Sequence, residues 1–408
     1  MAPLLNHLLS LTLVVPLAGA GAILLVARSG NPARARWLAL GSTVAAFLCT
    51  APLWFLYDPD GKTWQFAERF NWAAPIGASL YLGVDGTSIL FLLLASLIAL
   101  VAVLASWREI TTRVREFYAV LLFAEAGLFG VFMTLDLLVF FVSWQITLVT
   151  LHVLMRRWGG GASPRSSARF LFSALALSVL MFAGMVALYL TNPGGSSAYS
   201  SDIALLHTRA LPPLLQTWVF VAFILAFGGT MSLFPFHRWM VDAQAAAPTA
   251  VSILLAAVLT KMGSYAVFRL LLPVVPDASR QFAPVVAWVA IAGMLYGAFL
   301  AWRQQDFQRL LACATVSQMA VMMFGLFALT PAGVGGSVVH QFGHGFWIAG
   351  LFVWAAIVSD RPGAREIPSV SGMRKAKLGP ATLLYAITLA GMALSGLLGF
   401  VNAGYPRP

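Results

Sequence analysis

The sequence predicts an all-α polytopic membrane protein with about twelve transmembrane helices. Three observations lead to this fold class. Of the 408 residues, 60% are hydrophobic and only 10% are charged, whereas a soluble domain contains roughly 25% charged residues. Apolar runs of about 20 residues, the length that crosses a bilayer, recur along the whole chain. The basic residues gather in the short segments between these runs.

Each predicted helix is an apolar run bounded by polar residues, glycine or proline. The runs are continuous rather than alternating, which argues against the strands of a membrane β-barrel. The first run is too long for a typical signal peptide and lacks a basic leader, so we expect a retained helix. The predicted helices lie near residues 4–27, 36–57, 80–105, 116–132, 134–155, 168–191, 214–236, 249–272, 284–302, 308–329, 336–358 and 380–400.

The lysines and arginines predict the orientation of the bundle. Most of the 25 basic residues fall in alternate loops, such as the segment with Arg156, Arg157, Arg165 and Arg169. Cytoplasmic loops of membrane proteins carry this excess, so the net charge of +11 reflects topology and not nucleic acid as a partner. We expect a multi-pass protein of the inner (plasma) membrane with both termini outside.

The sequence contains no recognisable catalytic constellation. Cys49 and Cys313 lie in apolar runs and give neither a disulfide framework nor metal-ligand spacing. A nucleophile elbow, a phosphate-binding loop and a dinucleotide fingerprint are all missing from the sequence. We therefore expect no redox site, cofactor or metal in this chain.

One segment departs from the regular pattern of spans and loops. The stretch "GGTMSLFPFHRWMVDAQAAAPTAV" places Pro235 at the end of one helix and Pro248 at the start of the next. Backbone groups freed near a membrane must be met by protein or by water. We expect the helix to break near Thr230–Pro235, beside an internal polar cavity.

Three ionisable residues, Glu125, Lys261 and His344, fall near the middle of apolar spans. A charge at the bilayer centre costs at least about 2.5–3.5 kcal/mol on insertion scales, so such residues are candidates for function. Each also has a structural interpretation. Lys261 could form an ion pair with a carboxylate such as Glu125, Glu125 could be a neutral hydrogen-bonded acid, and His344 could be a neutral hydrogen-bonded histidine. Glycines flank His344 and would let another helix approach closely.

Other polar residues lie nearer the ends of the spans. Asp85 and Asp136 stand where a helix begins, so either could be an N-cap or a functional carboxylate. His152 lies one turn before a pair of arginines, which favours an interfacial position. His237 and Asp242 fall in the connector after the broken helix.

Several motifs in order along the chain resemble a known family. The most specific stretch is "FPFHRWMVDAQAAAPTAVSILLAAVLTKMGSYAVFRL", and "LYLGVDGTSILFLLL", "EAGLFGVFMTLDLLVFFVSWQ", "DFQRLLACATVSQMA" and "HQFGHGFWIAGLF" support it. The chain resembles the antiporter-like membrane subunits of respiratory complex I, most closely the M-type subunit of NADH–quinone oxidoreductase. The same superfamily includes subunits of multisubunit cation/proton antiporters and membrane-bound hydrogenases.

The resemblance implies an antiporter-like fold of about fourteen helices, with two inverted five-helix repeats that each contain a discontinuous helix. On this basis we expect a three-helix segment at 1–112, a first repeat at 113–275 and a second at 276–408. Because the chain ends at Pro408, the second repeat is expected to be incomplete, either in a truncated sequence or in a reduced copy.

The resemblance also implies a proton relay along a central polar axis. Lys261 and His344 match the family's lysine and histidine on the eighth and eleventh helices. The family's glutamate, second lysine and second histidine fall at Gln145, Thr230 and Gln318, which do not titrate near neutral pH. The expected proton path is therefore modified. Its candidate residues are Lys261, His344, Glu125, Gln145, Thr230, Gln318 and His237.

The leading hypothesis is a membrane-arm subunit of a complex I-like NADH–quinone oxidoreductase, which takes part in or supports proton translocation. Its partners would be other membrane subunits, and redox chemistry would belong to them. The alternatives are a subunit of a multisubunit cation/proton antiporter or of an inorganic-carbon uptake complex, and a structural subunit that moves no protons.

Overall fold

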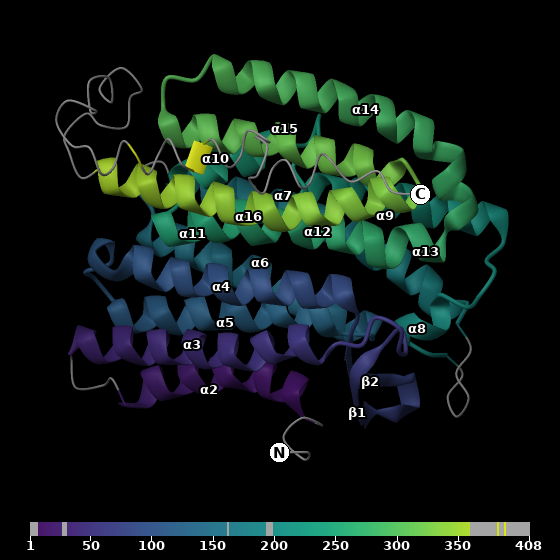
Figure 1. Ribbon diagram of the computed structural model, residues 1–408, viewed down its shortest axis with the longest axis horizontal. Coiled ribbons are helices and arrows are strands. Elements are labelled where there is room, and N and C mark those ends of the chain that lie inside the picture. The colour runs from purple at the N-terminus through teal and green to yellow at the C-terminus, as the bar shows by residue number, and fades with distance from the viewer. Residues whose placement is uncertain are drawn as a thin grey trace.

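The computed structural model describes residues 7–26, 31–160, 163–192 and 199–359, and the single positions 382, 387 and 388. Within these residues, eleven helices are long and apolar enough to cross a membrane. They run side by side as one bundle (Figure 1). The twelfth predicted helix, near 380–400, lies outside the described residues apart from those three positions. The prediction of an all-α membrane fold is confirmed.

Each predicted helix before residue 360 overlaps one helix or composite helix of the structure. The long helices are α2 (Leu8–Val26), α3 (Pro32–Leu56), α4 (Gly86–Glu109), α5 (Val114–Met133), α6 (Leu137–Trp158), α7 (Ser163–Leu190), α9 (Pro213–Thr230), α14 (Pro276–Trp302), α15 (Phe307–Phe327) and α16 (Pro331–Ser359). A short helix, α8 (Ile203–Leu206), lies between α7 and α9.

The predicted start of a helix near residue 80 is wrong. Residues 65–84 form a β-hairpin in which β1 (Gln65–Ala73) pairs antiparallel with β2 (Ala78–Val84) through a short 3-10 turn at Ala74–Ile76. The apolar run begins inside β2, so hydropathy alone does not separate the strand from the following helix. Helix α4 begins only after Asp85, whose side chain accepts a hydrogen bond from the Ser88 amide at 2.8 Å. The predicted N-cap role of Asp85 is confirmed.

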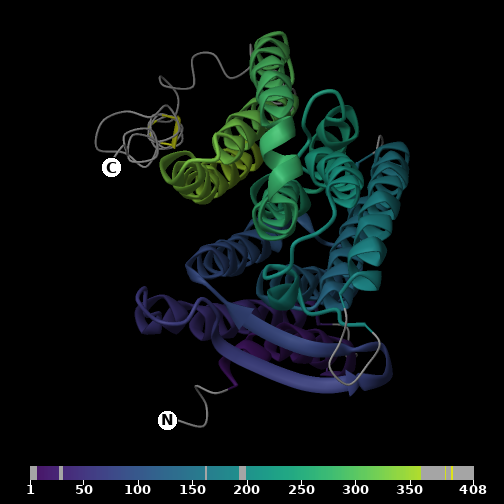
Figure 2. The ribbon, with the colours of Figure 1, turned by 90° about the vertical axis from the view of Figure 1, so that its right-hand side faces the viewer.

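The hairpin joins the helix ends on one side of the bundle, where the end-on view of Figure 2 shows it. Glu68 of β1 is buried and accepts hydrogen bonds from the first turn of α2, including the Leu9 amide at 2.9 Å. Asp136 caps α6 through the amides of Leu138 and Val139, which confirms its predicted cap role. The same carboxylate accepts from the Ser79 amide of β2 at 2.9 Å. These buried carboxylates satisfy helix amides that would otherwise lack partners.

The predicted break near Thr230–Pro235 is confirmed. Helix α9 ends at Thr230, and turns follow until α10 (Arg238–Ala246) begins near the opposite end of the bundle from the hairpin (Figure 1). Ser232 has a φ of 65°, a left-handed conformation that a helix cannot continue through. The next helix starts at Thr249, directly after Pro248.

A composite helix from Thr249 to Val274 runs through the centre of the bundle, and almost all of its residues are buried. It consists of α11 (Thr249–Leu254), a π-helical turn η3 (Leu255–Leu259), α12 (Thr260–Ala266), a second π-helical turn η4 (Val267–Leu271) and α13 (Leu272–Val274). Wide π turns inside α-helices occur frequently at functional sites. We call this element the lysine helix, because Lys261 lies on α12.

Helix α4 holds the lysine helix at both ends. At one end, the Glu109 carboxylate accepts a hydrogen bond from the Thr249 amide at 3.2 Å. At the other end, Asp85 pairs with Arg269 at 2.9 Å. The two contacts lie at opposite ends of α4, so the lysine helix and α4 lie side by side along their length.

Candidate functional site

Lys261 is completely buried between the two π turns of the lysine helix. Its Nζ lies 2.7 Å from the Ala256 carbonyl oxygen, 3.3 Å from Thr260 Oγ1 and 2.8 Å from His344 Nδ1. An ammonium group has three N–H donors, and these contacts supply three acceptors. Among the described residues, these three acceptors satisfy the charged lysine without a carboxylate counter-ion.

The contact with His344 can hold Lys261 in either its charged or its neutral form. The ring nitrogen accepts a hydrogen bond from a charged lysine, and a neutral lysine accepts one from a protonated Nδ1. One proton can therefore lie on either side of the same 2.8 Å contact. Such a pair titrates as a unit, and it can pass a proton without moving a helix.

Small residues make this contact possible. A Cβ on Gly345 would lie 2.6 Å from a Leu94 side-chain atom of α4, so α16 and α4 pack closely beside His344. This confirms the expectation of a close helix approach there. A Cβ on Gly263 would lie 2.6 Å from the Phe227 carbonyl oxygen, which places the end of α9 directly against α12. The lysine thus lies where several helices meet.

The polar contacts continue from the lysine helix onto α16 and α15. Ser264 donates a hydrogen bond to the side-chain oxygen Oε1 of Gln341 on α16, and Gln341 Nε2 in turn donates to Ser337 Oγ at 3.2 Å. His340 Nε2 lies 2.8 Å from Gln318 Oε1 on α15. Gln318 is one of the predicted path residues. It contacts His340, and the His340 ring lies 6.5 Å from the ring of His344, centre to centre.

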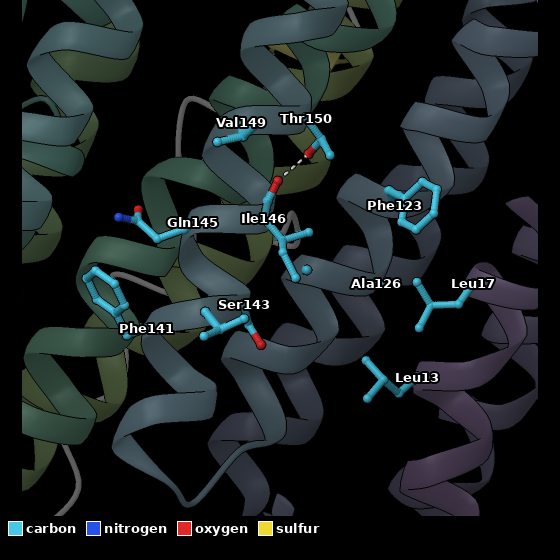
Figure 3. A pocket seen from close by; sticks show the side chains of 12 residues that line it. Leu13, Leu17, Phe123, Ala126, Phe141, Ser143, Gln145, Ile146, Val149 and Thr150 are labelled. Atoms are coloured by element: carbon cyan, nitrogen blue, oxygen red, sulfur yellow. Dashed lines mark hydrogen bonds between the residues drawn. The ribbon is translucent and has the colours of Figure 1, made fainter.

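Gln145 and Thr230 are not joined to Lys261 by a hydrogen bond in the described structure. Thr230 Oγ1 donates to the Ala226 carbonyl of its own helix at 2.9 Å. Gln145 accepts from Ser178 of α7 at 3.0 Å and lies at the edge of an apolar groove of about 630 Å³ between α2, α5 and α6. In Figure 3 its amide points away from Leu13 and Phe123, across α6. Both side chains lie on the expected helices, but each forms its hydrogen bond with its own helix or with the adjacent one.

Glu125 is buried on α5, with 1% of its surface exposed, so its carboxyl does not face lipid. Neither carboxyl oxygen has a hydrogen-bond partner among the described residues. The structural alternative of a Lys261–Glu125 ion pair is therefore wrong, because no carboxylate lies within salt-bridge distance of Lys261 in the described residues. The alternative of a hydrogen-bonded Glu125 is likewise not observed there.

His237 lies in a separate polar pocket of about 410 Å³ near α10. Asp242 in the same pocket pairs with Arg169 at 2.7 Å and with Arg309 at 3.2 Å. Burial lowers the pKa of His237 below its ordinary value. A polar pocket therefore lies beside the broken helix, as predicted, but it is open at the end of the bundle, with half-exposed arginines on its rim, and is not an internal cavity.

A second charged cluster closes the hairpin end of the lysine helix. Arg269 is buried and donates to Asp85, to Ser88 Oγ at 2.7 Å and to the Tyr265 hydroxyl at 3.1 Å. Its guanidinium lies 4.3 Å from the centre of the Trp64 ring. Burial opposes ionisation of Asp85, but the charge and hydrogen bonds of Arg269 and Ser88 hold its pKa below the ordinary value. Within the described residues, no group of three or more histidine, cysteine or acidic side chains could hold a metal ion.

Sequence comparison assigns this architecture to a family. The model of the family described as NADH:quinone oxidoreductase/Mrp antiporter, transmembrane, matches residues 134–405. The chain belongs to this family. The NADH-quinone oxidoreductase subunit M of Rhodobacter capsulatus is 33% identical over 414 residues, covering 98% of this chain and 79% of that protein. The NAD(P)H-quinone oxidoreductase chain 4 3 of Trichormus variabilis is 34% identical, covering 90% and 68%. The chain spans about two thirds of the length of that relative.

Solved structures agree with this membership in the NADH:quinone oxidoreductase/Mrp antiporter family. A chain of respiratory complex I from Thermus thermophilus superimposes with a TM-score of 0.87 at 28% identity, over 97% of this chain and 80% of that chain. A chain of the Mrp complex from Dietzia sp. DQ12-45-1b has the same fold, with a TM-score of 0.82 at 23% identity. It is matched over 42% of its length.

Two residues beside Lys261 and His344 are not predicted from the sequence. His340 stands in the quoted motif "HQFGHGFW", four residues before His344, but half-buried histidines give no hydropathy signal. Arg269 is not among the candidates predicted from the sequence, although the spacing of Lys261, Tyr265 and Arg269 at four residues places all three on one face of a helix. Helical spacing from Lys261 and His344 would have indicated both residues.

Proposed function

We propose that the chain is a membrane-arm subunit of a complex I-like NADH–quinone oxidoreductase, and that it conducts protons through the Lys261–His344 pair. The curated relatives named as subunit M and chain 4 of such oxidoreductases support the assignment. The membrane is the inner (plasma) membrane, and both termini lie outside. The partners are other membrane subunits of the assembly.

The single observation that carries the proposal is the 2.8 Å contact between Lys261 Nζ and His344 Nδ1 in the buried centre of the bundle. A purely structural lysine is best satisfied by a carboxylate, which keeps its charge permanently. Lys261 instead contacts the imidazole of His344, a group that can itself take up and release a proton. That arrangement suits a proton that arrives and leaves.

The proposed path is modified relative to the pattern that the resemblance implies. Gln145, Thr230 and Gln318 carry hydrogen bonds but no charge near neutral pH. The pair at Lys261 and His344 must then load and unload without a neighbouring acid–base couple on α6 or α9. Glu125 and His237 stay candidates for the approaches to the pair, and each lies in a separate part of the bundle.

Reconstituting the intact complex in proteoliposomes tests the proposal. We expect Lys261→Ala to lower the number of protons moved per electron, while NADH–quinone electron transfer continues. The matched control is Lys62→Ala, which makes the same change at an exposed loop residue. An unchanged proton-to-electron ratio in Lys261→Ala would show that the chain supports the assembly without conducting protons.

Electron transfer itself belongs, in this proposal, to partner subunits, and this chain holds no redox cofactor. Residues 113–275 and 276–408 are proposed as two inverted repeats that follow an N-terminal segment at 1–112. The broken connection between α9 and α11 would be the discontinuous helix of the first repeat.

The second candidate function is a subunit of a cation/proton antiporter, which the fold shared with the Mrp chain favours. The same proteoliposomes separate the two. Proton movement that requires NADH and quinone supports the oxidoreductase. Proton movement driven by a sodium gradient without NADH supports the antiporter.

A further inference from the structure

We propose that His340 is the proton carrier that follows His344, and that Gln318 holds the His340 ring in the receiving orientation. The inference rests on the proposed function, because it adds a member to the path that begins at Lys261. His340 and His344 are four residues apart on α16, so their side chains leave the same face of the helix. Their ring centres are 6.5 Å apart.

Gln318 selects the tautomer of His340. Its carbonyl oxygen Oε1 lies 2.8 Å from His340 Nε2, and a carbonyl oxygen only accepts hydrogen bonds. Nε2 therefore carries the hydrogen. In the neutral ring the other nitrogen, Nδ1, then holds a lone pair and is the atom that can receive a proton.

His344 presents a matching free nitrogen. Its Nδ1 is occupied by Lys261, whereas its Nε2 is buried without a hydrogen-bond partner among the described residues. Buried polar atoms are nearly always bonded to protein or to water. Ring centres 6.5 Å apart are too distant for a direct bond between the rings but leave room for one bridging water.

The transfer conserves protons at every step. The Lys261 ammonium gives a proton to His344 Nδ1, and His344 releases the proton on Nε2 to the bridging water. The water passes a proton to His340 Nδ1 and returns to its neutral form. His340 then carries a single positive charge while Gln318 still accepts from its Nε2. One charge has moved from α12 to the α15–α16 interface, and no electrons are exchanged.

The charges around the rings fit this order. Lys261 Nζ lies 2.8 Å from His344, and the His344 and His340 rings are 6.5 Å apart. A positive charge on any one of the three opposes a second proton on its neighbour, because like charges this close repel. The three groups therefore carry one proton at a time, in the order of the path.

The contact also accounts for the glutamine at position 318, where the family resemblance places a histidine. In this chain the histidine is on the other helix of the same interface, 2.8 Å away. The histidine thus lies on α16 and the glutamine on α15, and the two side chains still contact each other at the same interface. Exchanging the two residues should then preserve function.

Proton-to-electron ratios of the intact complex in proteoliposomes test this inference. We expect His340→Gln to lower the ratio to the value of Lys261→Ala while electron transfer continues. We expect the exchange His340→Gln with Gln318→His to restore it, which a merely structural role of His340 would not predict. The matched control is His152→Gln, because His152 is also partly buried in a membrane helix and bonds the Ser167 carbonyl at 2.9 Å.

The outcomes separate the inference from the proposed function. If Lys261→Ala lowers the ratio but His340→Gln matches His152→Gln, the inference is wrong and the proposed function stands. If Lys261→Ala leaves the ratio unchanged, the proposed function itself fails. Should His340→Gln impair assembly, the exchanged variant decides, because it keeps one histidine and one glutamine in contact. A wild-type ratio then supports the inference, and a lowered ratio overturns it.

Discussion

Glu125 illustrates how a single buried residue constrains what the molecule can do. Both carboxyl oxygens lack a hydrogen-bond partner among the described residues, and the side chain is 1% exposed. An ionised carboxylate in such surroundings would cost far more than a neutral acid. We therefore expect Glu125 to be present as the uncharged acid.

Replacing Glu125 with glutamine tests this expectation. Because an amide has nearly the same shape and no charge, we expect Glu125→Gln to assemble normally and to melt at an unchanged temperature. The proton-to-electron ratio of the same variant decides whether Glu125 belongs to the approaches to the Lys261–His344 pair, and a wild-type ratio would exclude it. The control is Glu116→Gln on the same helix, where the carboxylate is exposed and pairs with Arg157. A lowered ratio in a stable Glu125→Gln complex would instead place Glu125 in the proton path.

At the scale of residues, the sequence indicates side chains whose charge would be costly inside a membrane span, and it does not indicate neutral polar side chains. A lysine or glutamate inside an apolar run stands out, so Lys261 and Glu125 were predicted, and both are buried. His340 has no such cost because a neutral histidine fits a half-buried helix face. That Lys261 has no ion pair within the described part of the chain could not be predicted, because this depends on how the neighbouring helices are rotated.

The lysine helix shows what the packing of elements requires. Gly263 lies two residues after Lys261, and a Cβ there would come within 2.6 Å of the Phe227 backbone oxygen. A backbone atom cannot move aside as a side chain can. Even one added methyl group must therefore push α9 away from α12.

We expect Gly263→Ala to destabilise the protein by about 1–3 kcal/mol, the usual cost of overpacking a tight core. Thermal unfolding of the purified complex, followed by loss of the assembled form, measures the effect. Gly335→Ala on α16 is the matched control, because no atom lies within 4 Å of its added Cβ. In a helix that control change should be neutral or slightly stabilising. Equal melting temperatures for the two variants would contradict the close approach of α9.

At the scale of elements, apolar runs predicted the helices well and their irregularities less well. Prolines and glycines indicated the break after α9, because those residues act locally on the backbone. The β-hairpin was missed because β2 is as apolar as the helix that follows it. The two π turns of the lysine helix leave no signal in the composition of the sequence, and in the structure they pack against α4, α9 and α16.

At the scale of the whole molecule, the structure separates the loops into two groups at opposite ends of the bundle. The hairpin and α8 lie at one end, and α10 lies near the other (Figure 1). The excess of arginine and lysine in alternate loops predicts that the hairpin end faces outside. The separation of the ends follows from the structure, whereas the side that each faces is a proposal.

Labelling of single cysteines tests the proposed orientation. In a background with Cys49 and Cys313 replaced, we expect Lys62→Cys, beside the hairpin, to react with a membrane-impermeant maleimide added outside intact cells. We expect Arg238→Cys, in the polar pocket near α10, to react only after the membrane is opened. The reverse pattern would invert the topology and leave the fold as described.

The double attachment of the lysine helix to α4 has a mechanical consequence. Glu109 holds the Thr249 end, and Asp85 holds Arg269 near the other end. Because both ends of the lysine helix are attached to α4, the helix cannot shift along its axis relative to α4 while these contacts hold. One π turn lies on each side of Lys261, and the second of them includes Arg269. A displacement of Lys261 along the helix would therefore require a local change in the winding of those turns, between two attachments that stay in place.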